Sequence, residues 1–169
     1  MAHSRFKTGN NKRNTSHVRY KIKRMANWQM RRANLGDTDA LSSCIDAAYS
    51  IYAARVTDLP AVSEGIADDI ADHRVWVAEI DREIVGGIVL MVEDGHLLLA
   101  NVAVHPKRTG LGIGRGLMAR ADTDCRALGL RELRLSTHVQ IPENVALYTH
   151  LGWEETGRTG NKVLMRKLL

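Results

Sequence analysis

The chain has 169 residues, 44% of them hydrophobic and 25% charged, which is enough for one ordinary domain with its own core. It contains no apolar run of the roughly 18 residues that a membrane-spanning helix requires, so we expect no transmembrane segment. The formal net charge of +5 is unevenly spread, because residues 1–36 hold ten Lys and Arg without any Asp or Glu and the remainder carries a net −5. The net positive charge therefore comes from the N-terminal segment.

Residues 1–29 are rich in Asn, Ser, Lys and Arg and have little hydrophobic periodicity, so we predict an arm outside a folded domain that spans residues 30–169. A disordered tail, or a start codon chosen upstream of Met25 or Met30, is the favoured interpretation. An arm that orders on a partner subunit, an organelle-targeting peptide and a nucleic-acid contact are the alternatives, although we expect no nucleic-acid partner. A secretory signal is excluded because the segment has no apolar core.

The domain is predicted to open with a short strand at 30–33, followed by a helix with Asp37 as its N-cap. The apolar stripe of this helix has helical spacing: Leu41, Cys44, Ile45, Ala48 and Tyr52. After a break at 58–60, a second helix is predicted from apolar residues four apart: Val62, Ile66 and Ile70. Cys44 and Cys125 both fall on apolar helix faces, which favours two reduced core thiols in a cytosolic protein.

Strands are predicted at 75–80 and 84–92, joined as a hairpin, with a bend or bulge at the Gly86-Gly87 pair. Asp94-Gly95 is a strong turn signal that leads into a third apolar strand, 97–104. Polar residues then follow Pro106, and Gly110, Gly112 and Gly114 alternate just before an amphipathic helix. A glycine loop at a helix N-terminus leaves main-chain N–H groups without partners, which favours an anion such as a phosphate or pyrophosphate.

Two common phosphate motifs do not fit this loop. A nucleoside-triphosphate loop needs Gly-Lys-Ser/Thr, but the fifth residue after Gly110 is Arg115 and no such tripeptide follows. A dinucleotide fingerprint needs G-x-G-x-x-G, and here the third glycine, Gly114, comes one place early. A third possibility remains, together with a plain glycine turn between strand and helix.

The segment 102–114 resembles the coenzyme A motif of the GNAT-type N-acetyltransferase superfamily, which usually reads Gln/Arg-x-x-Gly-x-Gly/Ala at the loop. Thr109 departs from that pattern at its first position, and Arg108 or Arg115 would supply the missing positive charge. A later segment resembles the family's Asn-x-x-Leu-Tyr-x-x-Leu-Gly-aromatic motif, and its matching residues are Asn144, Leu147, Tyr148, Leu151, Gly152 and Trp153. Two motifs in the right order make the resemblance specific, and it covers roughly residues 30–169.

Around the second motif we predict a helix from Pro142 to a stop at Gly152, and strands at 133–137, 153–156 and 163–167 with a turn at 157–161. Strands 97–104 and 133–137 should be parallel because a helix separates them. The resemblance implies an α/β fold with a mixed, mostly antiparallel sheet of six to seven strands, a splayed parallel pair and about four flanking helices.

The resemblance also implies acetyl transfer from acetyl-CoA directly to a primary amine of a small molecule or protein, without a metal. The expected cofactor contacts are Val102, Ala103, Val104, Thr109, Gly110, Leu111, Gly112, Ile113, Gly114, Arg115 and Asn144. Tyr148 is the candidate acid for the departing thiolate, and His138 is a candidate base. Asn101 could bind the acceptor or hold a water. A cytoplasmic homodimer is expected, and the domain's net −5 favours a cationic acceptor. The alternative is a non-catalytic acetyl-CoA sensor of the same fold.

Overall fold

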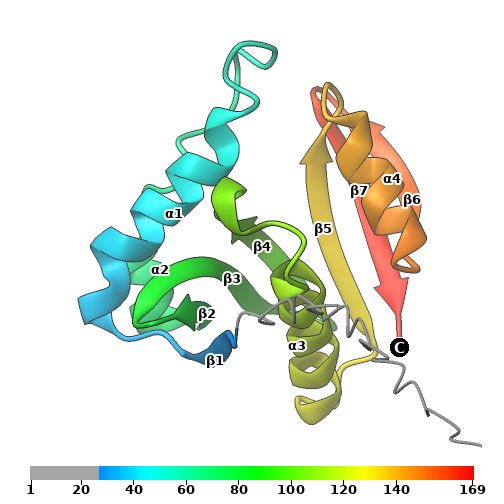
Figure 1. The fold of residues 1–169 in the computed structure, drawn as a ribbon. Helices are drawn as coiled ribbons and strands as arrows, with labels where there is room; N and C mark the ends of the chain where they lie inside the picture. Colours follow the sequence, from blue (N-terminus) through cyan, green and yellow to red (C-terminus); the bar gives the residue numbers. More distant parts are fainter. Residues whose placement is uncertain (1–26) are drawn as a thin grey trace, which may run out of the picture.

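The computed structural model describes residues 27–169, in which seven strands form one mixed sheet of order β1-β2-β3-β4-β5-β7-β6 (Figure 1). The strands are β1 (Gln29–Arg32), β2 (Arg74–Ile80), β3 (Glu83–Glu93), β4 (His96–Val104), β5 (Glu132–His138), β6 (Glu154–Thr159) and β7 (Lys162–Leu168). Neighbours pair antiparallel except β4 and β5. The predicted α/β class with one parallel pair is confirmed.

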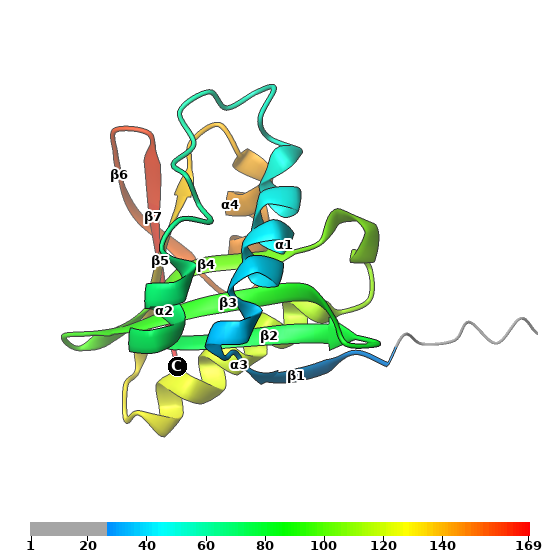
Figure 2. The ribbon, with the colours of Figure 1, turned by 90° about the vertical axis from the view of Figure 1, so that its left-hand side faces the viewer.

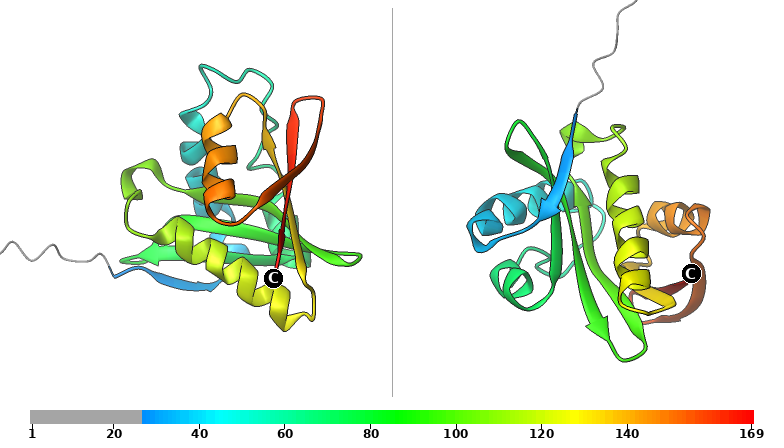
Figure 3. Two further views of the ribbon diagram at one scale, coloured as in Figure 1. Left: turned by 90° about the vertical axis from the view of Figure 1, so that its right-hand side faces the viewer. Right: turned by 90° about the horizontal axis from the view of Figure 1, so that it is seen from below.

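Helices cover both faces of the sheet, as the view from below in Figure 3 shows. One face carries α1 (Thr38–Ser50) and α2 (Ile66–Asp72), and the other carries α3 (Ile113–Ala127) and α4 (Pro142–His150). Each pair closes its own apolar cluster: Leu41 and Ile45 of α1 lie in one, and Leu117 of α3 lies in the other. Cys44 and Cys125, one in each cluster, are buried free thiols.

The glycine pair in β3 lets helices approach the sheet from opposite sides. A Cβ on Gly86 would lie 2.9 Å from Ile113 of α3, and a Cβ on Gly87 would overlap Leu41 of α1. The predicted bulge is present beside this pair, because Ala78 pairs with Gly86 whereas Glu79 pairs with Ile84, which leaves one extra residue in β3. A second bulge lies in β4, between the pairs Val89–Asn101 and Leu90–Leu99.

The parallel pair joins only at its beginning. Leu97 pairs with Leu133 and Leu98 with Arg134, and beyond these residues the strands separate. In Figure 1, β5 runs upward with α4 while β4 turns away toward α1. The sheet is therefore split at one end, with β4 held by β3 and β5 held by β7.

Several predicted boundaries are wrong for identifiable reasons. The second helix starts at Ile66 and not near Val62, because Gly65 takes the left-handed conformation (φ +76°) directly before it. The turn predicted at 157–161 is shorter, since β6 continues to Thr159 and only Gly160 and Asn161 connect it to β7. The first strand is displaced by one residue, to Gln29–Arg32.

Asp37 holds the predicted N-cap position of α1, but its side chain makes no capping hydrogen bond to that helix. It accepts the main-chain N–H of Asn34 (2.8 Å) and two hydrogen bonds from the Arg31 guanidinium (2.8 and 2.9 Å). The carboxylate thus fastens the short 3-10 turn Leu35–Asp37 to β1. Within residues 27–169, no helix combines the length and apolar character needed to cross a bilayer.

Candidate functional site

The loop between β4 and α3 presents a row of free main-chain donors. Pro106–Arg108 forms one 3-10 turn, and α3 begins at Ile113 without a side-chain cap. No residue of the described chain accepts a hydrogen bond from the N–H groups of residues 109–115. These groups lie where the positive end of the α3 dipole adds to them, so the loop is suited to a phosphate or diphosphate.

The three glycines of this loop differ in what they do. Gly110 and Gly112 have φ values of +79° and +80°, so both are required by the backbone itself. Gly114 is helical, and a Cβ there would meet only Val104 at 3.6 Å, an ordinary contact. Neither strain nor crowding inside the protein therefore demands a glycine at position 114, and its bare backbone is available to a ligand.

Trp28 braces this loop from the side of β1. Its indole Nε1 donates to the carbonyl of Leu111 (3.1 Å), and its ring lies directly against Gly116 in the first turns of α3. Arg115 is exposed in the first turn of α3, and Arg108 lies 3.3 Å from Glu83 on the hairpin. Both arginines are at the rim of the loop.

The free edge of β4 faces the split in the sheet. His105 donates its main-chain N–H to Val85 of β3 (2.8 Å). Because N–H and C=O groups alternate between the two edges of a strand, Val104 and Val102 present theirs to the opposite edge, where β5 has already separated. Ala103 points its side chain into the core beneath α1. An extended amide chain placed in the split would find the main-chain partners that β5 does not supply.

Tyr148 stands on α4 at the other wall of the split, 8% exposed, with its ring 6.0 Å from that of Trp153. No described residue forms a hydrogen bond with its hydroxyl. Burial, with lesser contributions from Tyr49 of α1 and from Tyr52 just after that helix, raises the pKa of this phenol well above its usual value. The Tyr49 and Tyr52 rings are themselves 6.3 Å apart, so α1 brings a pair of tyrosines near Tyr148.

The connection between α1 and α2 reaches over the split to the second half of the sheet, as Figure 2 shows above the strands. Arg55 forms an ion pair with Glu143 at the start of α4, and its guanidinium lies 5.5 Å from the Tyr52 ring centroid. Asp58 accepts a hydrogen bond from Asn161 (2.7 Å) in the β6–β7 turn. A cleft of about 430 Å³ lies beside the Asp58–Asn161 contact and is lined by both residues.

His138 lines that cleft, but both of its ring nitrogens have neighbours. Nδ1 accepts the main-chain N–H of Gln140 (3.1 Å), and Nε2 lies 2.9 Å from the Asp58 carboxylate in poor hydrogen-bond alignment. In a neutral imidazole accepting at Nδ1, the proton resides on Nε2, beside Asp58. This arrangement leaves no free lone pair for a base and so does not favour that role, which stays a prediction for His138.

The two amides that the sequence singled out lie on opposite sides of the split. Asn144 donates to Thr137 of β5 at 3.4 Å. Asn101 donates to the carbonyl of Val62 (2.9 Å), and its Oδ1 is enclosed without a partner among the described residues. Residues 27–169 contain no group of three or more His, Cys, Asp or Glu placed to hold a metal.

The comparisons with known proteins agree with this geometry. A family model described as an acetyltransferase (GNAT) domain matches residues 71–155, which is half of the chain and includes both the glycine loop and Tyr148. The chain belongs to the GNAT acetyltransferase family. The family assignment made from the two sequence motifs is therefore confirmed.

Individual GNAT proteins resemble the chain at low identity. The uncharacterized N-acetyltransferase YjgM of Escherichia coli is 27% identical over 135 residues, which are 74% of this chain and 81% of YjgM. The fold is similar to that of the PaiA N-acetyltransferase of Thermoplasma acidophilum, solved in complex with coenzyme A (TM-score 0.77, 20% identity, 85% of this chain and 99% of that one). YncA of Salmonella typhimurium, solved with acetyl-CoA, gives a TM-score of 0.65 at 20% identity, covering 85% and 94%.

Sequence reasoning did not assign some residues of this GNAT site. Trp28 fell in the predicted arm, and Tyr52 was assigned only to the apolar stripe of a helix. Arg55 and Glu143 are 88 positions apart, so only the folded chain brings them together. The one available sequence signal was Gly116, a fourth glycine two positions after Gly114, which could have indicated close packing against α3.

Proposed function

We propose that this GNAT protein transfers an acetyl group from acetyl-CoA directly to a primary amine of a small molecule or protein. The proposal depends on one observation. β4 separates from β5, and the loop that follows β4 has seven main-chain N–H groups without a partner in the described chain. A diphosphate on the loop and an amide-containing arm along β4 would place a thioester near Tyr148. The coenzyme bound in PaiA and the acetyl-CoA bound in YncA support this choice of cosubstrate.

The chemistry needs few side chains once the thioester is held in place. The amine nitrogen attacks the thioester carbonyl carbon, whose oxygen gains negative charge and accepts a hydrogen bond from a main-chain N–H of β4. The C–S bond then breaks, the proton lost by the amine passes to water, and the sulfur takes up a proton to leave as a thiol. The products are the N-acetylated amine and coenzyme A.

Tyr148 donates a hydrogen bond to the departing sulfur. Burial raises the pKa of its phenol, so the hydroxyl stays protonated throughout the neutral range and remains a hydrogen-bond donor. The donor stabilises the thiolate as it forms. Because the phenol does not ionise near neutral pH, we expect no loss of activity from ionisation of Tyr148 between pH 7 and about pH 10.

Replacement of Tyr148 by Phe tests this assignment. The Tyr148→Phe variant should lose about 100-fold in kcat, because the donor acts only as the thiolate develops, while its Kd for acetyl-CoA stays within about twofold. Release of free thiol over a panel of amines gives kcat, and calorimetry gives Kd. Tyr52→Phe is the matched control, since it removes a nearby phenol hydroxyl that has no assigned role and should keep kcat.

The same assay separates the enzyme from a sensor. Wild-type protein that binds acetyl-CoA but acetylates no amine in the panel would contradict the proposal and favour a binding module. A panel in which only anionic or neutral amines react would remove the expectation of a cationic acceptor. The cytoplasmic location and the homodimer stay predictions from the sequence.

A further inference from the structure

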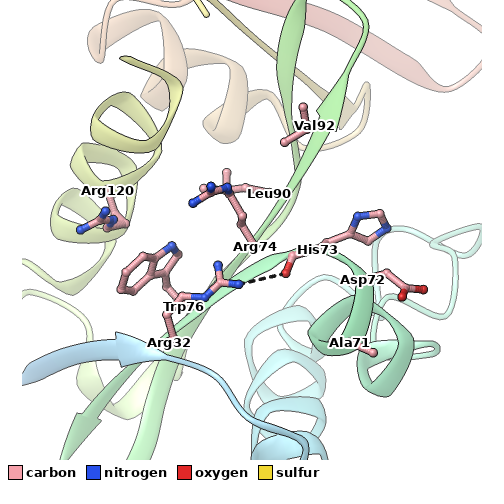
Figure 4. Close-up of a pocket in the computed structure, with 9 residues that line it drawn as sticks. All are labelled: Arg32, Ala71, Asp72, His73, Arg74, Trp76, Leu90, Val92 and Arg120. Atoms are coloured by element: carbon pink, nitrogen blue, oxygen red, sulfur yellow. Dashed lines mark hydrogen bonds between the residues drawn. The ribbon is translucent and has the colours of Figure 1, made fainter. Parts of the chain in front are cut away.

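A second cleft, of about 820 Å³, lies on the α3 face of the sheet away from the split (Figure 4). Its lining comes from β1, the end of α2, β2, β3 and α3: Arg32, Ala71, Asp72, His73, Arg74, Trp76, Leu90, Val92 and Arg120. Trp76 pairs with Ile88, which pairs with Val102, so the indole is two strands away from the free edge of β4.

One charge pair in this cleft is satisfied. Asp124 of α3 is 1% exposed and accepts hydrogen bonds from Arg120 Nε (2.9 Å) and from Trp76 Nε1 (2.9 Å). The Arg120 guanidinium lies 3.9 Å from the Trp76 ring centroid, so it is both stacked and paired. One side of the cleft is therefore a hydrogen-bonded group with no net charge, formed by Arg120, Trp76 and Asp124.

The other two arginines of the cleft are compensated less completely. Arg74 Nη1 lies 3.7 Å from Asp124 Oδ2, a long ion pair with a carboxylate that Arg120 already holds, and its side chain makes no hydrogen bond to a described residue. Arg32 has no carboxylate partner within residues 27–169, and it donates only to the carbonyl of His73 (3.3 Å). Burial and the nearby charges of Arg74 and Arg120 lower the pKa of Arg32, against an opposing contribution from Asp124.

Figure 4 shows the guanidinium groups of Arg32 and Arg74 facing the same space, whereas the Asp72 carboxylate lies apart from them beside α2. Arg32 is held over the Trp76 ring at 5.5 Å from its centroid, on the strand that pairs with β2. Two planar groups with several free N–H donors, whose nearest carboxylate, Asp124, is already bound by Arg120, match an anion that offers several oxygens.

We propose that the cleft between Arg32 and Arg74 binds the phosphate group of a small molecule, with both guanidinium groups as its ligands. The site is separate from the loop at residues 109–115, which follows the opposite end of β4. The proposal does not depend on the proposed acetyl transfer. A phosphate here would offset the excess positive charge of the two arginines and would lie beside the Arg120–Asp124 pair of α3.

The test follows the indole N–H of Trp76 by two-dimensional NMR while inorganic phosphate is added to the full chain. The protein is first saturated with coenzyme A, so that the glycine loop is filled, and ionic strength is held constant with chloride. The Trp76 signal should shift and saturate with phosphate and should not respond to chloride alone. The titration is repeated without coenzyme A, so that phosphate binding in this cleft is measured even if the protein does not bind coenzyme A.

The double variant Arg32→Gln/Arg74→Gln should lose at least tenfold in phosphate affinity. Arg126→Gln/Arg131→Gln removes the same charge from exposed positions outside the cleft and should keep the affinity within about twofold. Arg32→Lys, which keeps the charge without the planar fork, should lose less than the double variant. Equal losses in the two double variants, a Trp76 response that never saturates, or saturation by citrate but not by phosphate would overturn the proposal.

Discussion

Glycines at three alternate positions lead into α3, and only the last of them has no structural reason to be glycine. Gly110 and Gly112 hold left-handed conformations, whereas Gly114 is helical with room for a methyl group. A residue that the folded chain does not need, in a row of unsatisfied N–H groups, is best explained by a ligand that lies against the backbone.

Gly114→Ala should therefore separate stability from binding. Alanine favours a helix over glycine by up to about 1 kcal/mol, so the free energy of unfolding should stay level or rise. The added methyl group would stand where the diphosphate lies, and coenzyme A affinity should fall at least tenfold. Urea unfolding and calorimetry measure the two quantities.

Gly157→Ala is the control for this variant, because Gly157 has an ordinary φ, open space around its Cβ and a position on β6. It should leave coenzyme A affinity unchanged. A Gly114→Ala protein that binds coenzyme A as wild type does would show that the ligand does not touch this part of the backbone.

The sequence predicted a glycine loop here because both a turn and an anion site at a helix N-terminus require glycines at close, regular spacing. It did not predict Trp28, whose contact with Leu111 joins residues 83 positions apart. It also could not predict the neighbours of His138, because Asp58 reaches that ring from a loop with no periodicity of its own. Local structure that depends on a pattern was predictable, and contacts that depend on a distant partner were not.

Among the elements, α3 shows how packing can reverse a local preference. Gly116 lies in the helix interior, where alanine alone would be stabilising, but a Cβ there would overlap the Trp28 ring. Gly116→Ala should therefore displace Trp28, cost about 1–3 kcal/mol, and weaken coenzyme A binding severalfold through the lost bond to Leu111. Unfolding curves, indole fluorescence and calorimetry would show these effects.

A double-mutant cycle isolates that contact. In a Trp28→Ala background the overlap is gone, so adding Gly116→Ala should be neutral or stabilising. If Gly116→Ala costs the same with and without the indole, the contact does not explain the need for glycine.

The start of α1 is fixed by an ion pair and not by a helix cap. The Arg31 guanidinium, with the main-chain N–H of Asn34, lowers the pKa of Asp37. A lowered folded-state pKa stabilises the protein above the unfolded pKa of about 3.9, and this stabilisation is lost as pH falls through the folded value. Asp37→Asn should thus cost about 1–3 kcal/mol at pH 7, and the difference from wild type should shrink as the pH falls below about 4.

Unfolding by urea at several pH values measures this difference. Asp39→Asn, an exposed change in the first turn of α1, should cost only a few tenths of a kcal/mol. A pH-independent loss for Asp37→Asn would mean that the side chain acts through packing and not through its charge.

Element order was predicted well because most strands carry their own apolar run and turn signal, although β6 (Glu154–Thr159) has no apolar run. The start of α2 was not, since the four-residue spacing from Val62 continues through the turn before Gly65. Spacing alone could not show that Val62 lies outside the helix, where its carbonyl accepts a hydrogen bond from Asn101.

At the scale of the whole molecule, the two halves of the sheet share a short junction. Two register pairs join β4 to β5, and beyond them the halves meet through side chains such as the Arg55–Glu143 and Asp58–Asn161 pairs. These exposed pairs contribute little stability on their own. A ligand that fills the split would act as a missing strand between the halves.

Hydrogen exchange tests that role directly. Bound coenzyme A should slow exchange most at the N–H groups of residues 109–115 and of Val102 and Val104, because these are the donors without protein partners. At a free concentration of about 100 times Kd it should also stabilise the fold by about 2.7 kcal/mol. Since His105 and Ala103 direct their N–H groups toward β3, their exchange should change less than that of Val102 and Val104. Equal protection along β4, or protection that spares the loop, would place the coenzyme somewhere other than the split.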